Sequence, residues 1–264
     1  EFDSALKGIE PEVVVNFAAQ GMVAESWNTP WDWFETNTVG LSKVLHSLQG
    51  LNSLKKYVHV STPEVYGSTQ GWVQESLDFS PSTPYAVSRA AGDWHVLNLV
   101  KSGSLPAVIT RAANVYGPGQ QLYRVIPRAF LSAHLGEKFP LHGAGDSTRS
   151  FIYIDDVVDA TYRLCFVDTV GETFHISTDS LVSIRDLVLE VGNIAGVDFE
   201  NLIDQSPERV GKDDSYQLAS TKVRERTGWS DSFSRIQGLE AVNSWVVNNL
   251  ERLSTLPRVY EHKA

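Results

Sequence analysis

The stretch V-V-V-N-F-A-A-Q-G, residues 13–21, decides the fold class. Its first six residues are apolar apart from one Asn, and such runs are typical of parallel strands buried on both faces of a sheet. The run ends in the small residues Ala18 and Ala19. A flat ligand can therefore approach the backbone there, at the carboxyl end of the strand, where open α/β sheets bind ligands. Taken alone, the stretch fits a buried strand and turn better than a ligand site.

Working outward, apolar runs alternate with amphipathic stretches. Further strands are predicted at residues 57–60 and 107–112, and helices at residues 33–48 and 85–100. This order and spacing predict a parallel sheet with helices on both faces. After Gly119 the pattern loosens. We predict a helix over 124–135, a loop over 140–146, strands at 151–154 and 173–176, a helix from near Asp155, a helix over 184–195 with Ser183 as its N-cap, a short helix capped by Ser220 and ending near Gly228, and a final helix over 235–253.

Composition excludes several classes of protein. With 42% apolar and 20% charged residues, the chain is ordinary for a globular domain and is not predicted to be disordered. The formal charge is -10 and no basic tract is dense, so nucleic acid is not an expected partner. No apolar run approaches the roughly 20 residues that span a bilayer. Cys165 is alone and predicted to be buried, which fits a cytoplasmic protein. The histidines are scattered, so no metal site is expected.

Two motifs place acid–base chemistry at strand and helix ends. S-T-P-E-V-Y-G-S, residues 61–68, puts the Thr62 hydroxyl and the Glu64 carboxylate directly after a strand, where they suit substrate binding and general-base catalysis. P-Y-A-V-S-R-A-A-G-D, residues 84–93, puts Tyr85 and Arg89 four residues apart, on one helical face. A cation beside a phenol lowers its pKa and makes a proton shuttle. Each motif alone is better explained as a polar turn or a surface pair.

A third set of residues suits a diphosphate. R-A-A-N-V-Y-G-P-G, residues 111–119, is followed by Arg124 and then by G-A-G-D-S-T-R, residues 143–149. Guanidinium groups near glycine-rich loops pair with phosphate oxygens in bidentate fashion. Each arginine taken individually is more simply a solvated surface charge.

Together, and in this order, these segments resemble the extended short-chain dehydrogenases/reductases that act on nucleotide sugars, the NAD-dependent epimerase/dehydratase family, over residues 11–248. The most similar group is the nucleotide-sugar 4,6-dehydratases such as dTDP-glucose 4,6-dehydratase, which carry S-T-D-E-V-Y-G, then Tyr-x-x-x-Lys, then N-x-Y-G-P. The resemblance implies a Rossmann-type doubly wound parallel sheet with a smaller C-terminal substrate-binding domain. The partial NAD-binding domain would comprise residues 1–118 and 151–177, and the nucleotide-sugar-binding domain residues 119–150 and 178–264.

The resemblance also implies roles for individual residues, with NAD as cofactor and a nucleotide sugar as substrate. Thr62 would bind the sugar hydroxyl at carbon 4, Tyr85 would take its proton, and Glu64 would remove the proton at carbon 5. Water would leave from carbon 6, giving a 4-keto-6-deoxy sugar. The implied cofactor contacts are Phe17, Ala18, Ala19, Gln20, Thr36, Tyr85 and Arg89. The implied substrate contacts are Gly21, Thr62, Asn114, Arg124, Arg149 and Arg209.

Three departures from the family pattern carry expectations. The Gly-rich loop that receives the pyrophosphate is absent, so roughly two βα units of about 30 residues each are expected to be missing, and this chain is expected to bind NAD poorly. The family Lys is Arg89, which keeps the charge on a wider head. The dehydratase Asp is Pro63, which cannot donate a proton. A smaller departure is His175, where a dehydratase often has Asn.

Several alternatives stay open. A nucleotide-sugar 4-epimerase or decarboxylase of the same family shares the first oxidation, although Glu64 speaks against a simple epimerase. A non-catalytic paralogue or fragment is favoured by Arg89, Pro63 and the missing loop. Family members commonly form homodimers through two long helices, which correspond here to residues 33–48 and 85–100.

Overall fold

The computed structural model describes residues 2–206 and 217–262. The chain divides into two compact units, each made of three chain segments. The first unit comprises Glu1–Ala113, Val158–Ser177 and Tyr216–Ser230, and the second Asn114–Val157, Thr178–Ser215 and Asp231–Ala264. These boundaries differ from the predicted ones chiefly because residues 151–157 join the second unit and residues 216–230 the first. The ligand assigned to each unit remains a prediction.

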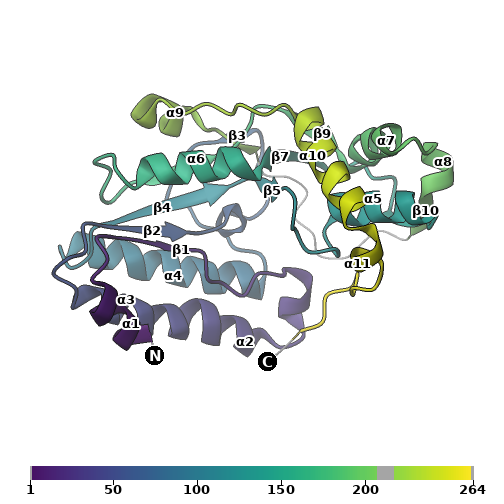
Figure 1. Ribbon diagram of the computed structural model, residues 1–264. Helices are drawn as coiled ribbons and strands as arrows, with labels where there is room; N and C mark the ends of the chain where they lie inside the picture. Colours follow the sequence, from purple (N-terminus) through teal and green to yellow (C-terminus); the bar gives the residue numbers. More distant parts are fainter. Residues whose placement is uncertain (1, 207–216, 263–264) are drawn as a thin grey trace. The chain divides into compact units, whose positions relative to one another are not determined.

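A four-stranded parallel sheet, in the order β1-β2-β4-β8, forms the centre of the first unit. Helices α3 (Leu41–Gln49) and α4 (Pro84–Lys101) lie on one face and α6 (Ile154–Leu164) on the other (Figure 1). This is the predicted α/β fold with a parallel sheet. Strand β1 is shorter than expected: it was predicted to reach Ala18 but ends at Asn16. The strands are β1 (Val13–Asn16), β2 (Lys56–Val60), β4 (Ala107–Ala112) and β8 (Thr173–Ile176).

The helix predicted over residues 33–48 is one continuous run in three parts. It begins as α2 (Pro30–Phe34), passes through the π-helix η2 (Glu35–Gly40) and continues as α3. Leu45, Leu48, Tyr57 and Ile109 belong to the apolar core between α3, α4 and the sheet. Full burial of each such side chain contributes about 1.5–3 kcal/mol, so this core fixes the helices that position the candidate site.

Shorter elements complete the first unit. The prediction that Ser220 caps a helix is wrong in one respect: helix α9 begins at Thr221, but the Ser220 hydroxyl makes no capping bond and instead donates to the Ser177 carbonyl at 2.9 Å. The remaining elements are α1 (Phe2–Ile9), the 3-10 helices η1 (Ala24–Trp27) and η3 (Pro63–Tyr66), β3 (Trp72–Val73), which pairs with β11 (Gln217–Leu218), and α9 (Thr221–Thr227).

The second unit packs its helices around one apolar core that includes Phe130, Leu187 and Leu239. As predicted, the Ser183 hydroxyl caps α7 by accepting from the Asp186 N–H at 2.9 Å. The helices are α5 (Val125–Leu135), α7 (Ile184–Ala195), α8 (Phe199–Leu202), α10 (Arg235–Asn248) and α11 (Leu250–Ser254); the strands are β5 (Asn114–Tyr116), β6 (Phe139–His142), β7 (Thr148–Tyr153), β9 (Leu181–Ser183) and β10 (Ile203–Ser206).

Two predictions for this unit are wrong. Residues 140–146 were expected to form a loop, but Phe139–His142 is a strand that pairs in parallel with β10, a partner far along the chain. The final helix was expected to run unbroken, but it breaks at Asn249, whose backbone (φ -123°, ψ 14°) leaves the helical region between α10 and α11.

Candidate active site

The loop after β1 presents the residues predicted to contact the cofactor. Phe17 is 62% exposed, and Ala18 and Ala19 are exposed beside it. Asn16 fixes the start of the loop, because its Oδ1 accepts from the Ala18 N–H at 3.0 Å and its Nδ2 donates to the Tyr57 hydroxyl at 3.0 Å. The loop therefore offers an open backbone with little side-chain bulk at the carboxyl end of a parallel strand.

Asn37 holds the far end of this loop, and sequence reasoning missed it. Its Oδ1 accepts from the Gln20 N–H at 2.8 Å and its Nδ2 donates to the Gln20 carbonyl at 2.9 Å. Nδ2 also lies 3.0 Å from Ser88 Oγ, which joins the loop to α4. The neighbouring Thr36, which was predicted, is exposed. At Gly21, no described atom lies within 4 Å of where a Cβ would stand, so packing does not require glycine.

The segment after β2, residues 61–67, forms a tight turn that we call the β2 turn. Thr62 is buried and caps η3, with its Oγ1 accepting from the Glu64 N–H at 3.3 Å. Glu64 itself is half-buried. Gly67 ends the turn at φ 67°, where a Cβ would lie 2.2 Å from the Ser80 carbonyl oxygen, so only glycine fits. The hydrogen bond and the glycine therefore fix the backbone that carries the predicted Thr62 hydroxyl and Glu64 carboxylate.

Helix α4 carries Tyr85 in its first turn. Thr83 caps the helix, because its Oγ1 accepts from the Ala86 N–H at 3.2 Å. The Tyr85 backbone is held on both sides: its N–H donates to Ser26 Oγ at 3.2 Å, and its carbonyl accepts from Ser88 Oγ at 2.7 Å. The half-buried phenol therefore projects from a backbone that is fixed by hydrogen bonds.

The Arg89 guanidinium is directed at the sheet. The residue is buried, and its Nη2 donates to the carbonyl oxygen of Val60, the last residue of β2. Burial raises the pKa of Tyr57 to about 12, and the Asn16 hydrogen bond and the Arg89 charge oppose that rise. The predicted action of Arg89 on Tyr85 remains a prediction. The observed contact anchors α4 to the strand that enters the β2 turn.

A buried polar cluster lies beneath the ends of β2 and β4. Asp93 and Arg111 are both 0% exposed and form an ion pair at 2.8 Å. His59 Nε2 lies 3.2 Å from Asp93 Oδ1, an electrostatic contact that is not aligned as a hydrogen bond. We call this set the Asp93 network; its members are His59, Ser61, Tyr66, Asp93, Arg111 and His175.

Electrostatics in the network follow from burial and from the ion pair. Burial alone would raise the pKa of Asp93, but His59 and Arg111 hold it at about 2. Burial lowers the pKa of His59, and burial together with the Arg111 charge lowers that of His175 to about 3. At neutral pH the cluster therefore holds one carboxylate, one guanidinium and two neutral imidazoles. Desolvation makes such a pair a weak source of stability, whereas loss of one partner leaves a buried charge.

In the second unit, a cavity of about 210 Å³ is lined by basic and aromatic side chains. Arg149, which was predicted to hold a diphosphate, lines it together with Arg128, His142 and Tyr123. Arg149 Nη1 donates to the Thr148 carbonyl at 2.8 Å. Two guanidinium groups beside aromatic rings suit a phosphorylated nucleotide. Sequence reasoning missed Arg128, although its place one helical turn after a predicted arginine was a usable signal.

The other predicted substrate residues have separate places. Arg124 is exposed, and its guanidinium lies 5.6 Å from the centre of the Tyr123 ring. Asn114 joins β5 to β7, because its Nδ2 donates to the Ser150 carbonyl at 3.1 Å. Arg209 falls outside the described residues. The structure therefore places Arg124 against Tyr123, which lines the same cavity as Arg149, and leaves Asn114 in the sheet.

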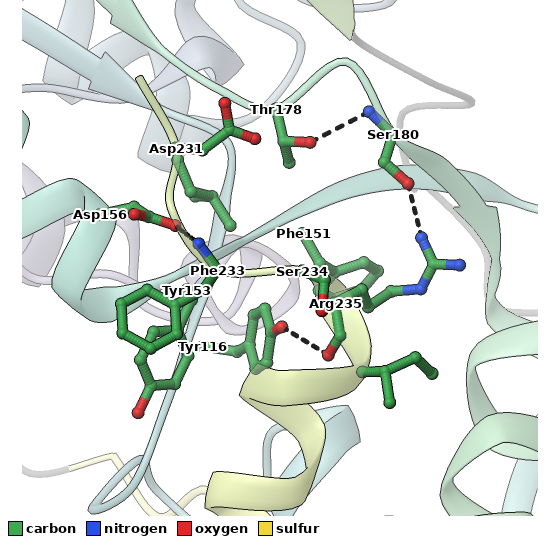
Figure 2. A pocket seen from close by; sticks show the side chains of 12 residues that line it. Tyr116, Phe151, Tyr153, Asp156, Thr178, Ser180, Asp231, Phe233, Ser234 and Arg235 are labelled. Atoms are coloured by element: carbon green, nitrogen blue, oxygen red, sulfur yellow. Dashed lines mark hydrogen bonds between the residues drawn. The ribbon is translucent and has the colours of Figure 1, made fainter. Parts of the chain in front are cut away.

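A second cavity in this unit, of about 370 Å³, has aromatic and polar walls (Figure 2). The Tyr116 hydroxyl donates to the Arg235 carbonyl at 3.1 Å, and Arg235 Nη1 donates to Ser180 Oγ at 2.6 Å. Arg235 also forms a bidentate pair with Glu190 at 2.8 Å. The one arginine among the described residues that line this cavity is thus paired with Glu190.

A family model described as GDP-mannose 4,6 dehydratase matches residues 1–242. The chain belongs to this family. A dTDP-glucose 4,6-dehydratase of Streptomyces niveus is 30% identical over 239 residues, which cover 90% of this chain and 70% of that protein. A trifunctional UDP-glucose 4,6-dehydratase/UDP-4-keto-6-deoxy-D-glucose 3,5-epimerase/UDP-4-keto-L-rhamnose-reductase of Arabidopsis thaliana is 28% identical over 246 residues, which are 92% of this chain but 37% of that protein. The chain thus spans about a third of the length of such plant relatives.

Solved structures agree with membership of the GDP-mannose 4,6 dehydratase family. The dTDP-glucose 4,6-dehydratase DesIV of Streptomyces venezuelae, with NAD and TYD bound, superposes with a TM-score of 0.88 at 29% identity, covering 95% of this chain and 77% of that one. The UDP-glucose 4-epimerase of Thermotoga maritima, with UDP-glucose, has a TM-score of 0.88 at 26% identity, covering 94% and 78%. The predicted family resemblance is confirmed.

The described part of the chain contains neither a cluster of metal ligands nor a membrane-spanning helix. Within residues 2–206 and 217–262, no group of three His, Cys, Asp or Glu side chains is placed to hold a metal ion. In the same described part of the chain, every helix is too short or too polar to cross a membrane.

Proposed function

We propose that this protein catalyses the NAD-dependent dehydration of a nucleotide-activated hexose to a 4-keto-6-deoxy sugar. One observation carries the proposal: α4, which bears Tyr85, is linked through Asn37 of η2 to the loop predicted to contact the cofactor, and is bonded directly to the turn that bears Glu64. Asn37 Nδ2 lies 3.0 Å from Ser88 on α4. Asp93 on α4 accepts from Ser61 Oγ at 2.8 Å. Relatives that are dTDP-glucose 4,6-dehydratases support the same chemistry.

Oxidation at carbon 4 requires a group that takes the hydroxyl proton. Tyr85 is assigned this role, because it projects from a helix start whose backbone is held by Ser26 and Ser88. Thr62 is assigned to bind the same sugar oxygen. Thr62 directly follows β2, and Tyr85 lies in the first turn of α4. Both are assigned to the carboxyl edge of the sheet, where α/β folds bind ligands.

Elimination requires a base at carbon 5, whose proton is acidified by the ketone at carbon 4. Glu64 accepts this proton, and the hydroxyl on carbon 6 then leaves as water. Pro63 cannot donate, so the proton for the leaving group comes from Glu64 or from solvent. Tyr85 and Glu64 together accept two protons, and two are used, one on the departing water and one returned to carbon 5. The cycle therefore consumes no further reactant.

The loop after β1 fits a flat cofactor ring. Ala18 and Ala19 are exposed without bulk, and the Gln20 backbone is fixed by Asn37, so the loop is shaped before a ligand arrives. When bound, NAD would accept hydride from carbon 4 and return it to carbon 6. Phe17, Ala18, Ala19, Gln20 and Thr36 are the residues we assign to it.

The Arg149 cavity is assigned to the nucleotide. Arg128 and Arg149 line it from α5 and β7, so one anionic group can meet two guanidinium groups. Tyr123 and His142 offer ring faces for a base. The identity of the base and of the sugar is left to experiment.

A 4-epimerase is the second candidate, because it shares the oxidation at carbon 4 and the fold of the Thermotoga maritima enzyme. Glu64 favours dehydration, since inversion at carbon 4 needs no base at carbon 5. The product separates the two candidates: a 4-keto-6-deoxy sugar forms a chromophore in alkali, and an epimerised sugar does not.

The deciding experiment assays the full-length protein with NAD against a panel of nucleotide hexoses. We expect the alkaline chromophore with at least one of them. Glu64→Gln should still oxidise carbon 4, seen as reduced nicotinamide, but should release no 4-keto-6-deoxy product. An epimerised product, or no product from any sugar although NAD binds, would contradict the proposal.

We also propose a homodimer formed through α2, η2 and α4. These elements expose large apolar side chains, with Trp31 at 65% and Trp94 at 44%, and Val39 and Val87 are exposed as well. Sedimentation should give the mass of two chains, and Trp94→Glu should shift it toward one. A wild-type monomer at assay concentration would exclude this interface. A cytoplasmic location stays a prediction.

A further inference from the structure

We propose that the Asp93 network positions the β2 turn, so that Ser61, Tyr66, Asp93 and Arg111 are positioning residues for Glu64 and Thr62. The inference rests on the proposed function, because it assigns the network to the step that Glu64 performs. None of these four residues needs to touch substrate.

Both ends of the turn are tied to the same ion pair. At its start, Ser61 Oγ donates to Asp93 Oδ2 at 2.8 Å. Near its end, the Tyr66 hydroxyl accepts from Arg111 Nη1 at 2.6 Å. Asp93 Oδ2 and Arg111 Nη2 lie 2.8 Å apart. The ion pair therefore closes a polar bridge under the turn, with Thr62 and Glu64 between its two supports.

Arg111 has little freedom to adopt another position. Its guanidinium carbon lies 4.9 Å from the centres of both the Tyr66 and Phe79 rings, and the residue is 0% exposed. Tyr66 is held further by His175, whose Nε2 lies 2.8 Å from the phenol oxygen. Charge, ring stacking and burial thus act together to fix where the turn ends.

The network also reaches the loop after β1. His59 Nδ1 lies 3.3 Å from the Tyr57 hydroxyl, which accepts from Asn16 Nδ2. Asn16 in turn accepts from the Ala18 N–H. A chain of polar contacts inside the first unit therefore runs from the predicted cofactor loop through Asp93 to Ser61, at the start of the turn that bears the predicted base.

The chemistry explains why such a support is useful. A displaced base loses rate steeply, with about 1 Å of misplacement costing on the order of 100-fold. If the turn loosens, oxidation at carbon 4 proceeds while removal of the carbon 5 proton slows. The expected signature is a lower kcat at similar KM, together with more reduced cofactor in the steady state.

The test compares Ser61→Ala and Tyr66→Phe with Ser220→Ala in the full-length protein. Each of the first two removes one tether and keeps the ion pair and the Tyr66 ring. Ser220→Ala is the matched control, because it removes a buried hydroxyl in the same unit whose hydrogen bonds go to the Ser177 carbonyl and to Arg224 and not to the turn. We expect about a 10- to 100-fold fall in kcat for the two tether variants and less than about twofold for the control.

Backbone hydrogen exchange supplies a readout that is independent of turnover. The Glu64 and Gly67 amides, bonded within the turn, should exchange faster in both tether variants and unchanged in Ser220→Ala. Faster exchange with a kcat loss and accumulated reduced nicotinamide supports the inference. Unchanged exchange in both variants overturns it, whether or not the protein is active. If the wild-type protein proves inactive but the tether variants still exchange faster, the network does position the turn, and only the proposed function is contradicted.

Discussion

The Asp93 network and the Arg149 cavity use the same cation in opposite ways. Arg111 is 0% exposed and its charge is met by Asp93 at 2.8 Å, whereas Arg149 is half-buried and lines an open cavity. In the first arrangement, the charge is paired inside the protein and holds neighbouring elements in place. In the second, the guanidinium borders a cavity that we propose to accept an anion. Burial, more than residue type, thus separates an arginine that holds the structure together from one that we propose to meet a ligand.

The largest effect is expected when the buried ion pair of Asp93 and Arg111 is split. Arg111→Met leaves the Asp93 carboxylate buried without its cation, and we expect a loss of about 3–5 kcal/mol in the free energy of unfolding by urea denaturation. The double variant Asp93→Leu with Arg111→Met removes both charges and should recover part of that loss. A single variant within about 1 kcal/mol of wild type would contradict the assigned burial.

At the Arg149 cavity, a substitution should weaken ligand binding and leave stability nearly unchanged. Arg149→Ala should weaken binding of a nucleoside diphosphate by about tenfold to a hundredfold, because a charge-assisted bond contributes about 1.5–3 kcal/mol. Its free energy of unfolding should change little. Isothermal titration and urea denaturation measure both, with the exposed Arg163→Ala as the control. If Arg149→Ala lowered the free energy of unfolding without weakening nucleotide binding, Arg149 would have a structural role and not a binding one.

Acid should destabilise the Asp93 network through His175. His175 has a folded pKa of about 3, below the roughly 6.5 of an unfolded histidine. The unfolded chain therefore binds more protons below that value, so stability is complete above about pH 6.5 and declines as pH falls toward 3. Between pH 6.5 and 5 the loss is about 2 kcal/mol, and His175→Asn should flatten it. An unchanged pH slope in that variant would exclude His175 as the source.

The smallest effect belongs to a charge pair that is neither buried nor beside a cavity. Arg163 and Asp159 lie 2.9 Å apart on α6, one helical turn from each other, with side chains more than 40% exposed. Asp159→Ala should change the free energy of unfolding by about 0.5 kcal/mol or less. A larger change would mean that exposure is a poor guide to the role of charge in this protein.

Sequence reasoning reached the features that depend on local pattern. The apolar runs predicted the four parallel strands, and Ser183 was correctly assigned as a cap because that motif lies within a few residues. Asn37 was missed because it acts through a contact to Gln20, which is 17 residues away in the sequence, and the assignment of Thr36 to the cofactor remains a prediction. Strand β6 was missed because its partner β10 is distant in sequence. The Asp93 network joins residues from five elements, β2, η3, α4, β4 and β8, and has no local signal at all.

The π-helix η2 keeps one face of the helical run buried. Trp33, Asn37, Leu41 and Leu45 are buried at intervals of four residues. An α-helix turns roughly 100° per residue, so three such steps would rotate the last side chain by about 120° from the first. The wider π turn absorbs most of this drift. Deleting one residue from Glu35–Gly40 would restore regular winding and force a choice between seating the leucines and keeping Asn37 against Gln20.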